Sequence, residues 1–168
     1  MSKYGTTVRD SDKFMMRLPA SLHAAMMMIA KANCRSLNSE ITYAFAQWFD
    51  PASSGRLTHQ LLMGCVDTTT AALAIAKVDR KFFEGRPVKF CCRFAPGQRG
   101  LIAGSANPEN EVSMNSYSIS VLSWWVTNHR ETQTLFDVVR RSGYLKTSMS
   151  PGLKHWAEDI RETRLYGN

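Results

Sequence analysis

The chain has 168 residues, enough for one ordinary domain or two small ones, and 44% of them are hydrophobic, as in globular proteins. Its longest apolar run, AAMMMIA, is too short to cross a bilayer, and the polar start MSKYGTTVRDSD lacks the apolar segment of an export signal. The formal charge is +7, with a basic excess between Lys77 and Arg99, which favours a polyanionic partner, although charge alone is equally compatible with a solvated surface.

The first regular pattern follows a polar segment, residues 1–12, which we expect to be a flexible arm. In KFMMRL, residues 13–18, the side chains alternate between two faces, as in a strand with one buried face. The inward face is apolar. The outward face carries Lys13, Met15 and Arg17.

Two helices are expected after this strand. Pro19 suits the start of the first helix, over 19–33, because a residue in the first turn needs no N–H partner. Ser36 suits the N-cap of the second helix, over 37–49. The apolar stripes of the two helices are Leu22, Met26 and Ile29, and Leu37, Ile41, Phe45 and Trp48, respectively.

Further helices and one more strand are expected in the rest of the chain. A helix is expected over 57–83, with an interruption at Gly64, and it ends at EGRP. A strand over 88–94 follows. A short helix within 95–110 is weakened by its glycines, and Ser113 caps a helix that begins SMNSYSISVLSWWV. Two helices separated by 143–152 complete the chain.

The second strand repeats the first. KFCCRFA matches KFMMRLP, and VSMNSYSISVLSWW matches RSLNSEITYAFAQW, with one extra residue between strand and helix in the second segment. The matches fall mainly at strand, cap and core positions in the same order, which favours duplication over coincidence. The outward face of the second strand carries Lys89, Cys91 and Arg93.

A strand with a basic outward face followed by two helices is the order of a ribbon-helix-helix unit, and residues 13–50 resemble the Arc/Mnt family of DNA-binding repressors. The resemblance is carried by Phe14, Arg17, Pro19, Arg35, Ser36, Asn38, Ser39, Glu40 and Ile41. It implies that two such units intertwine, that their strands form one antiparallel ribbon, and that this ribbon enters the major groove of double-stranded DNA.

The resemblance also implies which residues read the bases. They are Lys13, Met15 and Arg17 and, in the second segment, Lys89, Cys91 and Arg93. Arg17 can donate two hydrogen bonds to guanine. Met15 departs from the hydrogen-bonding residue usual in the family and offers only apolar contact, for instance to a thymine methyl. Packing of Met15 against a covering element is the alternative.

The helix caps are expected to hold DNA phosphates, because a helix N-terminus favours an anion. The residues concerned are Ser36, Leu37 and Asn38 in the first segment and Ser113 and Asn115 in the second. Ordinary caps without a ligand are the alternative.

Arg35 and Glu40 also match two members of a buried charged cluster of the Arc repressor, whose third position is Ala44 here. The second segment has Val112, Tyr117 and Val121 at these places, and apolar replacement of such a cluster is often neutral or stabilising.

The expected architecture is mostly α-helical with short β-strands, in tandem ribbon-helix-helix units on a helical core with additional helices. Its parts are the arm 1–12, the first unit 13–50, a helical connector 51–87, a degenerate second unit 88–126 and a helical C-terminal region 127–168. We expect the two strands of one chain to pair, because a covalent link raises the effective concentration of the partner strand to roughly millimolar. Pairing with a second chain, in a homo-oligomer, is the alternative.

These patterns indicate a transcriptional regulator that binds specific double-stranded DNA, a repressor on the family resemblance, in the cytoplasm of a bacterium or a phage-infected host. One alternative is a protein-interaction module, antitoxin-like or a host-takeover binder, with a protein partner bound through residues 127–168. Exposed tryptophans in SWWVTNH and GLKHWAEDI would favour it, and tryptophans packed in the core would not. Another is a relaxosome or architectural DNA-binding protein. Because no histidine, carboxylate or glycine-loop motif has catalytic spacing, and Cys34, Cys65, Cys91 and Cys92 have no metal or disulfide-framework spacing, we expect no enzyme, cofactor, metal or membrane partner.

Overall fold

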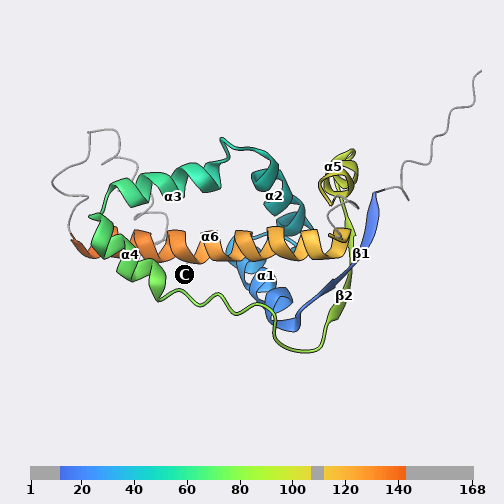
Figure 1. Cartoon of the computed structure of the whole chain (residues 1–168), viewed down its shortest axis with the longest axis horizontal. Helices are drawn as coiled ribbons and strands as arrows, with labels where there is room; N and C mark the ends of the chain where they lie inside the picture. The colour runs from blue at the N-terminus through green and yellow to red at the C-terminus, as the bar shows by residue number, and fades with distance from the viewer. Residues whose placement is uncertain (1–11, 107–111, 143–168) are drawn as a thin grey trace, which may run out of the picture. The chain divides into compact units, whose positions relative to one another are not determined.

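The computed structural model describes residues 12–106 and 112–142, and the chain divides into two compact units (Figure 1). Among the described residues, the ribbon unit comprises 12–54, 79–106 and 112–128, and the helical unit comprises 55–78 and 129–142. None of the helices in the described residues combines the length and apolar character that a membrane span requires.

A two-stranded antiparallel ribbon lies in the ribbon unit, where β1 (Lys13–Leu18) runs beside β2 (Val88–Arg93) (Figure 1). This confirms the predicted pairing of two strands from the same chain. The second strand ends one residue earlier than expected, but the N–H of Phe94 still donates to the carbonyl of Asp12 at 3.0 Å. The register pairs Lys13 with Arg93, Phe14 with Cys92, Met15 with Cys91, Met16 with Phe90, Arg17 with Lys89 and Leu18 with Val88.

The inward face of the ribbon covers a hydrophobic core. Met16, Leu18 and Cys92 have no exposed surface, while Phe14 and Phe90 are partly buried against the same cluster. The core is completed by α1 (Ala20–Ala32), α2 (Leu37–Phe49) and residues 114–128 of α6 (Met114–Ser142). The buried helix residues include Leu22, Met26, Ile29, Ile41, Phe45, Val121, Leu122 and Trp125. The predicted apolar stripes therefore face the core, where each large side chain stabilises the fold by about 1.5–3 kcal/mol.

The helices α1 and α2 each begin directly after the residue at their N-cap. Pro19 is the N-cap residue of α1 rather than its first helical residue. Ser36 caps α2 as predicted, since its Oγ accepts a hydrogen bond from the N–H of Ser39 at 3.1 Å. The cap satisfies one of the N–H groups that have no acceptor within the helix.

The helix expected over 57–83 is interrupted at Gly64, as predicted, but its extent differs from the prediction. Two helices are present, α3 (Ser54–Gly64) and α4 (Thr68–Ala76), and no helix follows α4 before β2. Asp67 causes the restart, because its carboxylate accepts the N–H of Thr70 at 2.9 Å and caps a new helix. Beyond Ala76 the chain joins the ribbon unit, where Phe82 is buried in the core without being helical.

The short helix expected within 95–110 is present as α5 (Gln98–Ser105). In contrast, α6 continues for 29 residues, where we expected one helix from Ser113 and a separate one further on. The polar stretch VTNHRETQT holds no glycine or proline that would break a helix, and the apolar residues after it, Leu135 and Val139, are buried in the core of the helical unit. The last predicted helix and residues 1–11 of the predicted arm 1–12 lie outside the described residues.

Candidate nucleic-acid interface

The outward face of the ribbon presents the six side chains that the sequence indicated. They are Lys13, Met15 and Arg17 on β1 and Lys89, Cys91 and Arg93 on β2. All are exposed except Lys13, which is half-buried. A basic pair stands at each end of the face, and the Met15–Cys91 pair lies between them. A two-stranded ribbon fits the DNA major groove, which is about 12 Å wide, and the basic pairs complement its charge.

Two asparagine side chains close the outer edges of the ribbon. The N–H of Arg93 donates to Oδ1 of Asn38 at 2.8 Å, and Nδ2 of Asn38 donates to the carbonyl of Arg93 at 2.9 Å. Asn115 makes the same two contacts with the backbone of Arg17, at 2.7 and 3.2 Å. Unpaired strand edges are templates for unwanted pairing, and each amide satisfies one edge residue. The first turns of α2 and α6 are thereby attached to the ribbon.

These contacts also show how the side chains of the outward face are spaced. The backbone N–H and C=O of Arg17 and Arg93 point to the asparagines, away from the opposite strand. Because cross-strand pairs alternate along an antiparallel ladder, the Met15–Cys91 pair also lacks mutual backbone hydrogen bonds. In such pairs the Cα atoms are about 4.5 Å apart and the side chains are close. Met15 and Cys91 therefore form one apolar patch.

The first turns of α2 and α6 carry matching caps. Ser36 Oγ accepts the N–H of Ser39 at 3.1 Å, and Ser113 Oγ accepts the N–H of Ser116 at 3.0 Å. The remaining first-turn N–H groups have no acceptor within the helix, as an anion site requires. The asparagine amides are engaged with the strands, so phosphate binding stays a prediction for the backbone and serine groups of these turns. The predicted phosphate contacts are those of Ser36, Leu37, Asn38, Ser113 and Asn115.

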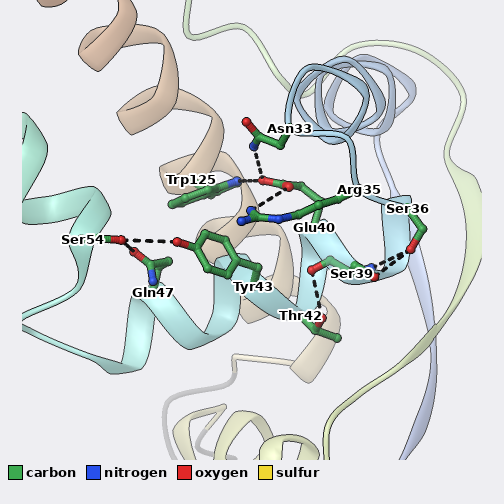
Figure 2. A network of polar contacts seen from close by, with 10 residues as sticks. All are labelled: Asn33, Arg35, Ser36, Ser39, Glu40, Thr42, Tyr43, Gln47, Ser54 and Trp125. Carbon is green, nitrogen blue, oxygen red and sulfur yellow. Dashed lines mark hydrogen bonds and ion pairs between the residues drawn. The ribbon is translucent and has the colours of Figure 1, made fainter. Parts of the chain in front are cut away.

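A buried carboxylate supports the start of α2 (Figure 2). Glu40 has no exposed surface and accepts hydrogen bonds from Asn33 Nδ2 at 3.1 Å, Arg35 Nη1 at 3.3 Å and Trp125 Nε1 at 2.9 Å. The Arg35 guanidinium also lies 4.0 Å from the ring centroid of Tyr43, a cation–π contact. A buried charge is tolerated only when it is paired and hydrogen-bonded, and these donors meet that requirement without a second arginine.

Two tryptophans connect α2 and α6 across the core. Trp125 on α6 donates to Glu40 on α2, and Trp48 on α2 donates to Tyr117 Oη on α6 at 2.8 Å. Trp124 packs edge-to-face on Trp48, with ring centroids 5.1 Å apart. Of the two tryptophans of SWWVTNH, Trp125 is therefore buried in the core and Trp124 is partly buried against it. The tryptophan of GLKHWAEDI lies outside the described residues.

Sequence reasoning found the outward face but missed the groups that hold it in place. The repeated Asn, two residues after each cap serine, was the available signal, but the sequence cannot show that it contacts the opposite segment's strand.

Burial beneath the ribbon raises the pKa of the Cys92 thiol to about 12, so this cysteine is a core residue. Among residues 12–106 and 112–142, no cluster of His, Cys, Asp or Glu could hold a metal ion.

Comparison with known proteins agrees with this geometry for the first segment. Residues 8–51 match the family model of the Arc-like DNA binding domain, which covers β1, α1 and α2 and ends before β2. No curated protein and no solved structure matches the chain. The match is consistent with a ribbon-helix-helix segment of the Arc/Mnt type at residues 8–51.

Proposed function

We propose that this protein is a transcriptional regulator that recognises specific double-stranded DNA by inserting the β1–β2 ribbon into the major groove. The observation that carries the proposal is the ribbon itself. The Arc-like segment supplies β1, and the same chain supplies β2 with a matching outward face. One chain therefore holds both strands that a major-groove ribbon needs.

We infer further that residues 88–126 are a diverged second copy of the ribbon-helix-helix unit. The contacts between the two segments are reciprocal, as in an isologous interface. The Asn38–Arg93 contact has its counterpart in Asn115–Arg17, and the Trp48–Tyr117 bond has its counterpart in Trp125–Glu40. Such reciprocity supports an approximate two-fold axis through the ribbon, as in a dimer of two separate units.

In this proposal the two kinds of group in the interface have different roles. Arg17 and Arg93 can each donate two hydrogen bonds to guanine, while Lys89 acts as a point charge toward a base or a phosphate. The first turns of α2 and α6 hold phosphates beside the groove and set the depth of the ribbon. The protein acts by binding alone, without catalysis, in the cytoplasm of a bacterium or a phage-infected cell. Occupation of a promoter then excludes RNA polymerase, which makes the regulator a repressor.

The proposal is tested by selecting bound sequences from a random pool of duplex DNA and footprinting the selected site in its natural surroundings. We expect one preferred site, and an affinity that falls with salt by about 0.9 logarithmic units per decade for every phosphate neutralised. A site that overlaps a promoter supports repression. A site remote from promoters favours the architectural role and contradicts repression. A pool that yields no preferred sequence contradicts specific recognition.

A further inference from the structure

The centre of the outward face is chemically different from its ends. Met15 is 54% exposed, and Cys91, directly opposite, is also exposed. A thioether has no donor, and a thiol is only a weak one. The flanking pairs, in contrast, are entirely basic. The middle of the outward face therefore presents an apolar surface to any ligand that contacts this face.

This surface restricts what the ribbon can cover. If the ribbon enters the major groove, as proposed above, its central pair removes water from the base edges it touches. Polar base atoms covered by Met15 and Cys91 would lose their hydrogen bonds to water without replacement, which is unfavourable. The apolar group that base pairs display in the major groove is the C5-methyl of thymine. The same methyl group occurs in 5-methylcytosine.

We propose that Met15 and Cys91 together recognise pyrimidine C5-methyl groups at the central base step of the DNA site. This inference rests on the proposed function and names what the centre of the interface selects. Because the two residues come from opposite strands of a ribbon with approximate two-fold symmetry, each contacts a methyl group on a different DNA strand. The longer Met15 side chain covers its methyl more completely, so the half-site beneath β1 is the more stringent one.

The experiment replaces single thymines in the selected site by deoxyuridine, which removes the methyl group and leaves the base pair intact. At the central step we expect each replacement to weaken binding by about fourfold, the value for one buried methyl group. The same replacement at a thymine of the selected site outside the central step is the matched control and should leave the affinity unchanged. A second arm places cytosine or 5-methylcytosine at the central position, and the methylated base should bind more tightly.

Two variants assign the effect to the side chain. Met15→Gln is nearly isosteric but polar, and we expect the penalty for deoxyuridine in the half-site beneath β1 to disappear. Met15→Leu keeps an apolar surface and should retain the penalty. Because Met15 is exposed, neither variant should change the circular dichroism spectrum or the unfolding midpoint.

The outcomes separate this inference from the function on which it rests. Specific binding that is equally tight to thymine and deoxyuridine overturns methyl recognition and leaves the DNA-binding function intact. A preference for A·T that survives loss of the methyl group shows that DNA shape is read instead, and it overturns the inference as well. Absence of any preferred sequence overturns both.

Discussion

Arg17 combines an exposed side chain with a fixed backbone. Its N–H and C=O are both bound to the amide of Asn115, and Arg93 is held in the same way by Asn38. A main chain that is already ordered loses less conformational freedom when the guanidinium binds. The two asparagines thus pre-organise the backbone of two arginines of the proposed DNA interface.

Replacing Arg17 by Ala should cost about 1–3 kcal/mol of specific binding and relax the preference at one base position. The cause is the loss of a two-donor contact to guanine. Competition gel shifts with a set of single-base site variants measure both effects. Arg141→Ala, which removes one exposed charge in the helical unit, is the control and should bind like the parent. An Arg17→Ala variant with unchanged affinity and preference contradicts the assignment of the outward face.

The two tryptophan donors should differ in their contribution to stability. Trp125→Phe removes a hydrogen bond to the buried carboxylate of Glu40, and we expect it to lower the free energy of unfolding by about 1.5–3 kcal/mol. Trp48→Phe removes a bond to the neutral phenol of Tyr117 and should cost only about 0.5–1.5 kcal/mol. Urea unfolding of both variants measures the difference. Equal losses would show that the charge of Glu40 adds nothing to the first bond.

Cys92 gives the fold a dependence on alkaline pH. Burial raises the pKa of its thiol from 9.0 to about 12, so the folded state keeps the thiol protonated where the unfolded chain would ionise it. This contribution to stability is complete below pH 9 and is lost as the pH rises toward 12. Alkylation at pH 9 should modify exposed Cys91 quickly and Cys92 only as fast as the protein unfolds. Equal modification rates, read by mass spectrometry of the peptides, would refute the burial of this thiol.

At the scale of elements, β2 is expected to contact DNA as β1 does. Replacing Lys89 and Arg93 together by Ala should weaken binding and reduce the salt dependence by about two units of slope if both residues neutralise phosphates. The slope of log affinity against log salt, measured by fluorescence anisotropy, provides the test. The Lys77→Ala, Arg141→Ala double variant removes two exposed charges of the helical unit and is the matched control. A normal slope in the first variant would mean that β2 has only a structural role.

Hydrophobic periodicity predicted the strands and helices whose apolar residues form one regular face. It did not predict the bounds of the helices whose sequence lacks such a face. The strands and the stripes of α1 and α2 were found because alternation and helical spacing are read directly from the apolar residues. The break after α3 was predicted from Gly64, but the end of α4 at Ala76 was missed because no glycine or proline occurs between Lys77 and Glu84. The length of α6 was missed because its middle is polar, and only the burial of Leu135 and Val139 shows why it continues.

At the scale of the whole molecule, the ribbon can be locked with a disulfide. Met15 and Cys91 form a cross-strand pair whose Cα separation, about 4.5 Å, lies within the range of disulfides. Met15→Cys, with Cys34 and Cys65 changed to Ser, should oxidise to a species of monomer mass with altered mobility on non-reducing gels. Met28→Cys in the same background, exposed on α1 and not opposite Cys91, is the control and should remain reduced. A band at dimer mass alone would show that the strand pairs with a second chain.

The pairing itself was predictable because the repeat supplied a second strand of the same length, alternation and outward chemistry. The residues of the outward face followed from the resemblance and from alternation. The roles of Asn38, Asn115 and Trp125 did not, because each acts on a partner more than 50 residues away in the sequence. Such contacts are set by how the two segments pack, and the repeated Asn after each cap serine does not by itself show which strand it contacts.

The intrachain ribbon also changes what mutation can do to this protein. In a symmetric dimer every substitution appears twice, so no half can change alone. Here the two strands are encoded at separate codons, and the two segments already differ at equivalent positions. Glu40 of the first segment accepts from Trp125, whereas Tyr117 of the second accepts from Trp48. A substitution in one segment can therefore change its side chains without the same change in the other segment. Under the proposed function, selection can tune one half of the DNA site while the other half stays constant.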